Sequence, residues 1–190
     1  MINIPQHPKI LAFVGMAGSG KSEAATYAQK VTGLPVIYFG QLTRDEVKKR
    51  GLELTPANER IVREDLRREF GMDVYAKRAV PVIRRHLEDN GSVLIDGLYS
   101  LAEWELLIKE FPQLAVVAIL ASPAVRYERL RERSDRPFSK DEARERDINE
   151  LRNLEKGGPL AMATHFIIND ETKKQLDEKV HAILEKEELV

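Results

Sequence analysis

The chain has 190 residues, of which 43% are hydrophobic and 32% charged, a composition that predicts one folded domain and excludes a disordered or membrane-embedded chain. Its 30 Lys and Arg residues are balanced by 31 Asp and Glu residues, which argues against a basic footprint for nucleic acid, and the lack of cysteine excludes disulfides and thiolate metal sites. The start MINIPQHPKI has no long apolar segment and no apolar run reaches the length of a membrane span, so we expect a cytoplasmic protein with no membrane contact.

Short apolar runs recur along the chain and predict five β-strands. Several of these runs are apolar throughout, which is typical of strands whose two faces are both covered. Helix-like patterns separate them, and this alternation predicts an α/β domain with a parallel sheet and helices on both faces. The expected strands are Lys9–Val14, Pro35–Phe39, Ser92–Ile95, Leu114–Leu120 and His165–Ile168.

The expected helices begin and end at typical capping residues. Thr55-Pro56 predicts the start of one helix and Gly71 its end. Pro81 lies within a further helical pattern, so we expect a kinked helix there or two separate helices. A last helix is expected over about Glu171–Glu187. The helix that ends at Gly71 has a predicted apolar stripe of Ile61, Val62, Leu66 and Phe70. Three more helices are expected to begin at Ser100, Ser122 and Ser139.

The strongest signal is a glycine-rich segment between the first strand and the helical pattern that follows it. The segment Gly15-Met16-Ala17-Gly18-Ser19-Gly20-Lys21-Ser22 matches G-x-x-x-x-G-K-[ST] in full. Glycines let backbone N–H groups surround phosphate oxygens, and the N-terminus of the next helix favours negative charge. Lys21 is expected to reach the β- and γ-phosphates, and Ser22 to bind Mg²⁺. The sequence therefore predicts a site for ATP with Mg²⁺.

A carboxylate is expected at the same edge of the sheet. Asp96 follows the third apolar run and precedes Gly97. Ligands of open parallel sheets bind outside the carboxyl ends of the strands, so we interpret Asp96 as a catalytic carboxylate that binds Mg²⁺ through water or orients an acceptor. The alternative is that Asp96 only begins the turn at Gly97.

Arginines are concentrated between the fourth and fifth predicted strands. Acidic residues alternate with them, so most are expected on a solvated helix face with i,i+4 partners. Two or three are expected to contact phosphate, because a guanidinium group is always charged and binds phosphate with two N–H groups. We select Arg133 and Arg136, where the predicted helix gives way to a loop. The cluster comprises Arg126, Arg129, Arg131, Arg133, Arg136, Arg144, Arg146 and Arg152.

Together these features resemble the nucleoside-monophosphate-kinase-like P-loop kinases, which include adenylate kinase and dephospho-CoA kinase. The similarity covers nearly the whole chain and is strongest to archaeal and bacterial dephospho-CoA-kinase-like ATPases. It rests on Ile95-Asp96-Gly97, on Leu120–Arg133, on His165–Asp170, and on the stretches Arg50–Thr55, Arg67–Asp73 and Arg146-Asp147.

The resemblance, together with the strand–helix alternation, implies a P-loop NTPase fold of three layers, α/β/α. We expect a five-stranded parallel sheet in the order 2-3-1-4-5 within a single domain over residues 1–190. Residues 41–90 are expected to form a helical acceptor-side region. Residues 134–158 are expected to form a lid that closes over the phosphates, with a hinge-like break at Gly157-Gly158-Pro159.

The acceptor side departs from the family's pattern. Gln41 follows Gly40 where the family has an acidic residue, although Arg44 is still expected to hold an acceptor phosphate. Adenylate kinases have Pro-Arg shortly after Asp-Gly, whereas this chain has Leu98-Tyr99-Ser100. These departures argue against a plain adenylate kinase and leave the identity of the acceptor open.

The sequence therefore predicts an ATP-dependent kinase that moves the γ-phosphoryl group to a small nucleotide-like acceptor, of nucleoside monophosphate or dephospho-CoA type. The alternative is a P-loop ATPase that acts as a nucleotide-dependent regulatory switch for a partner, an interpretation favoured by the altered acceptor side. The near-neutral charge and the 6% aromatic content argue against nucleic acid as a partner. The choice between ATP and GTP and the oligomeric state stay open. The predicted catalytic residues are Lys21, Asp96, Arg133, Arg136 and Arg44.

Overall fold

A computed structural model describes residues 9–134 and 137–190. At its centre lies a five-stranded sheet in which every neighbouring pair of strands is parallel. The strands follow the order β2-β3-β1-β4-β5, so the predicted α/β topology is confirmed. The bounds are β1 Lys9–Val14, β2 Val36–Tyr38, β3 Ser92–Asp96, β4 Leu114–Leu120 and β5 His165–Ile168.

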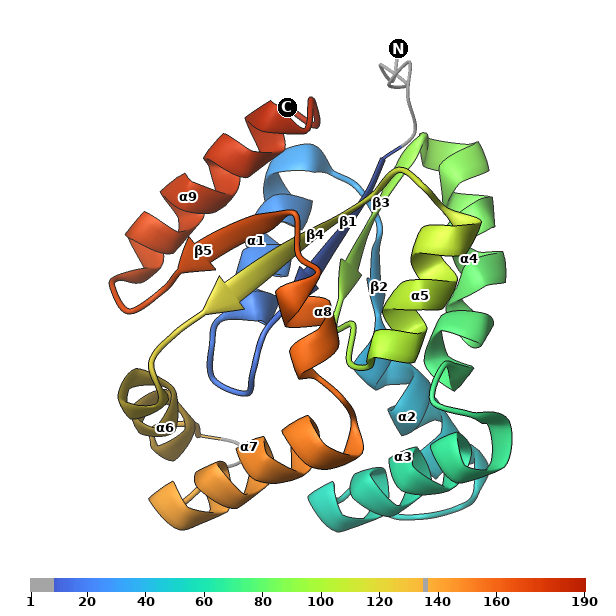
Figure 1. The fold of residues 1–190 in the computed structure, drawn as a ribbon, viewed down its shortest axis with the longest axis vertical. Helices are drawn as coiled ribbons and strands as arrows, with labels where there is room; N and C mark the ends of the chain where they lie inside the picture. The colour runs from blue at the N-terminus through green and yellow to red at the C-terminus, as the bar shows by residue number, and fades with distance from the viewer. Residues whose placement is uncertain (1–8, 135–136) are drawn as a thin grey trace.

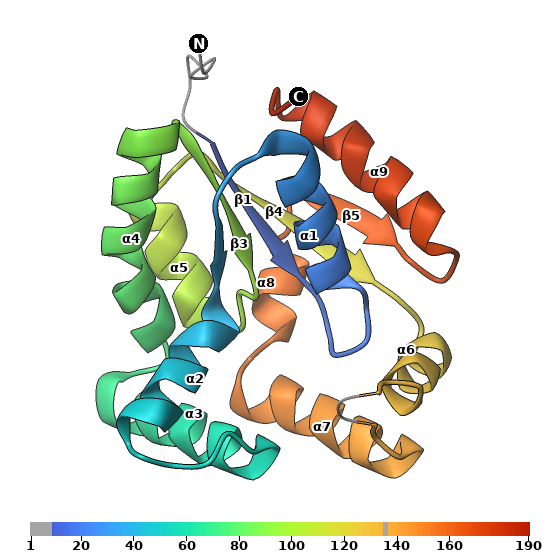
Figure 2. The same cartoon turned by 180° about the vertical axis from the view of Figure 1, so that it is seen from behind.

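Helices cover both faces of the sheet (Figures 1 and 2). One face packs against α1 and α9, which contribute apolar side chains such as Ala24 and Val180 to a common core. The other face packs against α4 and α5, through residues such as Ile83 and Leu107. The helices of the described residues are α1 Lys21–Thr32, α2 Phe39–Lys49, α3 Pro56–Phe70, α4 Val74–Asn90, α5 Leu101–Glu110, α6 Pro123–Arg131, α7 Lys140–Asn153, α8 Gly157–Ala161 and α9 Lys173–Lys186. None of them is both long and apolar enough to cross a bilayer.

Several helices gather beyond the carboxyl ends of the strands. In Figures 1 and 2, α2 and α3 lie below β2 and β3, while α6 and α7 lie below β4 and β5. The segment between β1 and α1 lies between these two groups, so the glycine-rich motif has the expected acceptor-side region on one flank and the expected lid segment on the other. The fold thereby places Lys21, Ser22 and Asp96 at one edge of the sheet.

Of the two alternatives for the helix around Pro81, the division into two helices was wrong, and so was part of the apolar stripe expected over 56–70. The helix around Pro81 is not divided, because α4 continues through the proline. Pro81 and Lys77 are both exposed, so water can bind the carbonyl group of Lys77 that the missing proline N–H leaves free. In α3, Ile61 and Phe70 are each 47% exposed, and the buried side chains are Val62, Leu66 and Arg67. The buried face of α3 thus holds fewer apolar residues than predicted, and it includes the charged Arg67.

Element ends shift slightly from the predicted ones. The second strand ends at Tyr38, and the buried Phe39 begins α2 instead of ending the strand. The third strand includes Asp96. The last helix begins after Thr172, whose hydroxyl accepts a hydrogen bond from the Gln175 N–H. That cap explains the later start, because a threonine hydroxyl satisfies a free N–H group of the first turn.

Candidate active site

The glycine-rich loop has the backbone conformation that its sequence predicts. Gly18 and Gly20 adopt φ angles of 79° and 98°, a left-handed conformation that residues with a Cβ rarely adopt. A Cβ on Gly20 would lie 2.4 Å from the Asn169 side-chain nitrogen, and one on Gly18 would lie 2.6 Å from the Arg126 carbonyl oxygen. Gly20 also precedes α1, whose first residue is Lys21. The loop therefore ends at a helix N-terminus, where free N–H groups favour an anion.

Two side chains from distant parts of the chain hold this loop. Asn169, which follows β5, donates from Nδ2 to the Ser19 carbonyl oxygen over 2.8 Å. Arg126 of α6 donates from Nη1 to the Ala17 carbonyl oxygen over 3.1 Å. The same guanidinium group forms two hydrogen bonds with the Asp147 carboxylate, of 2.9 and 2.6 Å. These buried contacts connect the loop to α6 and α7.

Lys21 and Asp96 face each other across the end of the sheet. Burial lowers the pKa of Lys21, and the negative charges of Asp96 and Glu150 oppose that shift. Burial likewise raises the pKa of Asp96, while Lys21, a hydrogen bond from Ser22 and Lys156 oppose it. Each charge is thus costly to bury and is stabilised by opposite charges nearby. The structure brings together three predicted residues, Lys21, Ser22 and Asp96.

The residues at this point fit Mg²⁺. Among the described residues, Asp96 Oδ1 is buried without a hydrogen-bond partner, and the Ser22 hydroxyl lies beside the same carboxylate. No group of three or more His, Cys, Asp or Glu side chains in the described part of the chain could hold a metal ion. Mg²⁺ suits such a sparse donor set, because it keeps several waters and binds substrate phosphates with few protein ligands.

Of the two arginines selected from the sequence, one can be placed. Arg133 lies just after the end of α6 and is exposed, and its positive charge contributes to lowering the pKa of Lys21. Arg136 lies outside the described residues. Arg146 of α7, which we did not select, acts on Lys21 in the same way. Its Nε donates to Glu150 Oε1 over 3.0 Å.

A buried ion pair near Lys21 was not predicted. Lys156, the residue before α8, is 2% exposed and donates to Glu150 Oε2. The pKa of Glu150 is about 2, because Lys156 and Arg146 outweigh the effect of burial. The pKa of Lys156 falls to about 8, since burial outweighs the attraction of Glu150 and Lys21 adds repulsion. Neither residue belongs to a sequence motif, and the pairing arises only where α7 ends and α8 begins.

The predicted acceptor arginine lies beside the second strand. Arg44 lies 5.7 Å from the centroid of the Tyr38 ring, and its Nε is 3.6 Å from Glu59 Oε1. Tyr38 pairs with Asp96 in the register of β2 and β3. Arg44, in α2, therefore lies over the last residue of β2, and Asp96 is the last residue of the neighbouring β3. Gln41 donates from Nε2 to Asp45 Oδ1 over 2.7 Å, so it points along its own helix.

A second buried ion pair fixes the turn after Asp96. Glu103, which is fully buried, accepts hydrogen bonds from the backbone N–H groups of Tyr99 and Ser100, at 2.7 and 3.2 Å. Its other oxygen accepts from Arg67 Nη2 at 3.0 Å. The serine–glutamate capping pattern predicted the helix start at Ser100 but not the role of Arg67. This arrangement positions Tyr99, whose ring lies over Gly97.

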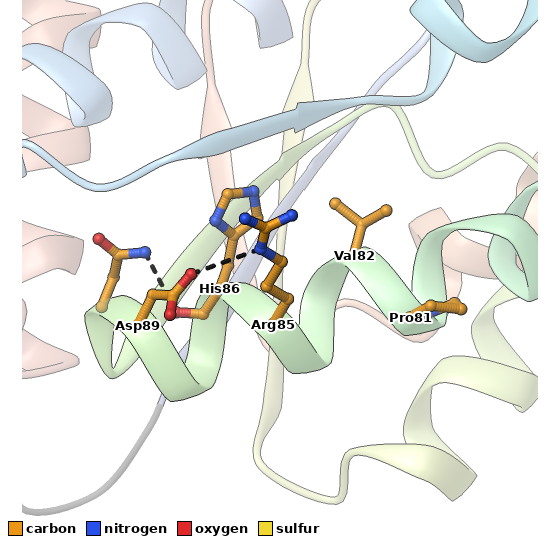
Figure 3. A pocket seen from close by; sticks show the side chains of 6 residues that line it. Pro81, Val82, Arg85, His86 and Asp89 are labelled. Carbon is orange, nitrogen blue, oxygen red and sulfur yellow. Dashed lines mark hydrogen bonds and ion pairs between the residues drawn. The ribbon is translucent and has the colours of Figure 1, made fainter.

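The surface has one pocket beside this site and another far from it. One of about 220 Å³ lies beside the phosphate loop. The other, of about 530 Å³, lies on the outer side of α4 and includes Pro81, Arg85 and His86 (Figure 3). It lies toward the end of α4 that precedes β3, opposite to the edge with the loop. The first hollow is lined by Gly20, Glu23, Arg129, Asn169, Glu171, Lys173 and Leu176.

Comparisons with known proteins agree with this geometry. Residues 14–149 match the family model described as an AAA domain. A UPF0200 protein of Thermococcus gammatolerans is 41% identical over 181 residues, which cover 93% of this chain and 94% of that protein. Among solved structures, shikimate kinase from Bacteroides thetaiotaomicron has a TM-score of 0.62 and 16% identity, and covers 95% of this chain and 98% of its own. A gluconokinase from Sinorhizobium meliloti has a TM-score of 0.57 and 16% identity, with 94% and 93% covered.

The two structural matches show the fold alone, which this chain shares with a shikimate kinase and a gluconokinase, and their identity to this chain is too low to indicate a shared substrate. The sequence matches are closer and extend over almost the whole chain. The family model, over residues 14–149, spans the glycine-rich loop. The chain therefore belongs to the UPF0200 family, with an AAA domain over residues 14–149.

Proposed function

We propose that the protein is an ATP-dependent phosphotransferase whose acceptor is a small nucleotide-like molecule. The single observation that supports this most strongly is the arrangement of Lys21, Ser22 and Asp96 at the end of the glycine-rich loop. A cation for the phosphates and a hydroxyl and a carboxylate for Mg²⁺ are the groups that phosphoryl transfer requires. ATP with Mg²⁺ would supply the transferable phosphoryl group and a divalent charge to stabilise it.

The nucleotide phosphates would lie against the loop from Gly15 to Gly20, with Lys21 on the β- and γ-phosphates. The nucleoside would extend toward the hollow beside Gly20, where Arg129 donates to the carbonyl oxygens of Asn169 and Glu171 over 2.9 and 3.1 Å. That hollow adjoins the loop through Gly20 and Asn169, so one molecule can reach both. The proposed site thus uses one continuous surface from β1 to α9.

The acceptor would lie on the other flank of the loop, between α2, α3 and the end of β3. Arg44 would bind an acceptor phosphate or carboxylate, and the exposed part of Tyr38 would offer an aromatic face. Arg63 of α3 is half-buried, and its positive charge acts on both Tyr75 and Tyr99. These residues favour an anionic acceptor with a planar group, which agrees with a nucleotide-like molecule.

Closure of residues 134–158 would exclude water from the transferring group, so that the acceptor receives it instead of solvent. Arg133, just before this segment, and Arg136 within it are the residues that we propose for the phosphoryl group. Hydrogen exchange with and without a bisubstrate analogue tests the closure, and equal protection in both states would contradict it.

A screen of turnover tests the function directly. The full-length protein is mixed with ATP and Mg²⁺, and each nucleoside monophosphate and dephospho-CoA is added in turn while ADP release is measured. Turnover that depends on one acceptor and is abolished by Lys21→Ala supports the proposal. Slow hydrolysis that no small acceptor stimulates would instead favour the regulatory switch, for which Gln41 and the absence of an arginine after Gly97 are the supporting observations.

A further inference from the structure

Lys156 is a buried lysine at the junction between α7 and α8. The residue precedes the short helix α8, and its side chain is 2% exposed. Burying an ammonium group costs free energy that a single ion pair often fails to recover. The preceding residue, Glu155, has a φ of 52°, which is an unfavourable backbone conformation for a residue other than glycine. Both features cost stability, and they suggest that the position serves another purpose.

The surroundings of Lys156 connect it to the phosphate loop. Its Nζ lies 5.0 Å from the centroid of the Tyr99 ring, which stands three residues after Asp96. Its positive charge acts on Asp96, and the positive charge of Lys21 acts on Lys156. Lys21 and Lys156 therefore approach Asp96 from different elements, one from the start of α1 and the other from the start of α8.

The charges of this cluster are not balanced. Lys21, Lys156 and Arg146 contribute three positive charges, whereas Asp96 and Glu150 contribute two negative ones. The neighbouring Asp147 is already paired with Arg126, so it does not change the balance. Glu150 serves two cations at once, with Oε1 to Arg146 and Oε2 to Lys156. Of the three cations, Lys156 is buried, while Lys21 and Arg146 are partly exposed. An excess of positive charge in such a partly buried cluster favours a further anion.

We propose that Lys156 is a second phosphate-binding catalytic lysine, whose ammonium group exchanges Glu150 for an oxygen of the terminal phosphate of the bound nucleotide. Glu150 acts as the resident anion when the site is empty and remains paired with Arg146 after the exchange. This inference rests on the proposed function, because it takes Lys21 and the glycine-rich loop as the place of the nucleotide. The terminal phosphate is the anion that completes the charge balance.

A purely structural pair would behave differently. If Lys156 and Glu150 only joined α7 to α8, removing the lysine would weaken the binding of every nucleotide alike, or of none. A lysine that binds the terminal phosphate discriminates between nucleotides that have this group and those that lack it. The number of phosphates on the ligand is thus the variable that separates the two interpretations.

Calorimetry with full-length protein and Mg²⁺ tests the proposal, using ADP and a non-hydrolysable ATP analogue with a P–N–P bridge. Lys156→Met should weaken binding of the analogue by about tenfold or more, the size expected for a charge-assisted hydrogen bond, and change that of ADP by less than about twofold. The double variant Lys156→Met/Glu150→Gln should show the same loss, and it removes the buried carboxylate that has lost its lysine partner if the single variant folds poorly. Glu150→Gln alone should retain the preference for the analogue. Lys174→Met removes a lysine from an exposed ion pair on α9 and is the matched control.

Equal effects of Lys156→Met on both ligands, or no effect on either, would overturn the proposal. An equal loss of analogue binding in Glu150→Gln would do the same, because it would assign the effect to the pair and not to the lysine. Lys21→Ala separates this result from the proposed function. If the wild-type protein binds the analogue and Lys21→Ala does not, the nucleotide site stands whatever Lys156 does, whereas a wild-type protein that binds neither ligand refutes both.

Discussion

Arg126 and Asp147 form a fork of two buried hydrogen bonds, of 2.9 and 2.6 Å, between α6 and α7. The two residues are 5% and 6% exposed. Arg126 Nη1 also donates to the Ala17 carbonyl oxygen within the phosphate loop. The pair thus connects the helix of the expected lid to the loop that we propose for the nucleotide, and a change in α7 can reach the loop through one side chain.

Asp147→Asn should therefore destabilise both the domain and the loop. The variant leaves a buried guanidinium group without its counter-charge, and breaking such a pair costs about 3–5 kcal/mol of unfolding free energy. Glu128→Gln is a suitable control, because its partner Arg131 is exposed and such pairs contribute about 0–1 kcal/mol. Urea unfolding measures both variants, and a loss in Asp147→Asn no larger than in the control would contradict this role.

Glu150 should make stability depend on pH in the acid range. Its pKa is about 2 in the folded protein, against 4.5 as the ordinary value, so the folded state favours the charged form. The stabilisation is complete above about pH 4.5 and is lost as the pH falls toward 2. A shift of this size corresponds to about 3 kcal/mol at neutral pH.

The measurement compares the wild-type protein with Glu150→Gln by urea unfolding across this range. The difference in unfolding free energy should shrink as the pH falls from 4.5, because the wild-type carboxylate becomes protonated. Glu145→Gln alters an exposed position of the same helix and should show no such trend. A difference that is the same at every pH would mean that the charge of Glu150 does not stabilise the fold.

Candidate site residues could be named from the sequence where they belong to a local motif, but the side-chain contacts between distant elements could not. The phosphate loop needs only glycines, a lysine and a serine at fixed spacing, so Lys21 and Ser22 could be assigned without knowing the fold. Asp96 followed from its place at the end of a buried strand. The Arg126–Asp147 pair joins residues 21 apart on different helices, and it was grouped with solvated charges because acidic residues alternate with the arginines along both.

The burial of Lys156 and Arg67 also could not be predicted from the sequence. Both are charged residues in the interior, and their burial depends on partners supplied by other elements, Glu150 in one case and Glu103 in the other. Helical periodicity treats a charged residue as exposed, and the pattern over α3 included Phe70 in the apolar stripe. In the structure Phe70 is 47% exposed and Arg67 is buried. Patterns of polarity locate the sheet and its loops, but not the charges that the fold pairs inside.

Asp96→Asn should lower turnover much more than it lowers ATP affinity. The substitution keeps the size of the side chain and removes the charge that faces Lys21, Ser22 and Lys156. If Asp96 binds Mg²⁺ or orients the acceptor, turnover should fall on the order of a hundredfold, as for other groups that stabilise the transferring charge. Turnover and ATP affinity are measured side by side, with Asp45→Asn on the exposed side of α2 as the control.

Arg44→Ala completes this comparison on the acceptor side. It should raise the KM for the acceptor and leave the ATP affinity unchanged, because Arg44 lies beside Tyr38 and away from the phosphate loop. Near-normal turnover in both Asp96→Asn and Arg44→Ala would refute an acceptor site between β2 and β3. It would favour the interpretation of the protein as a regulatory ATPase.

Alanine substitutions at Gly20 and Gly33 distinguish the free-energy cost of an unfavourable backbone conformation from that of a steric clash. Both adopt a left-handed conformation, with φ of 98° and 70°, at the two ends of α1. Nothing lies within 4 Å of a Cβ on Gly33, whereas a Cβ on Gly20 would lie 2.4 Å from Asn169 Nδ2. Gly33→Ala should therefore cost about 1–2 kcal/mol of unfolding free energy from conformation alone and leave nucleotide binding intact.

Gly20→Ala should cost more and also displace Asn169, which donates to the Ser19 carbonyl oxygen. We expect it to weaken nucleotide binding by about tenfold or more, since the loop N–H groups lose their alignment. Thermal unfolding and nucleotide titration of both variants give the two numbers. Equal losses of stability in the two variants, with unchanged nucleotide affinity, would mean that the Asn169 side chain moves without cost and does not position the loop.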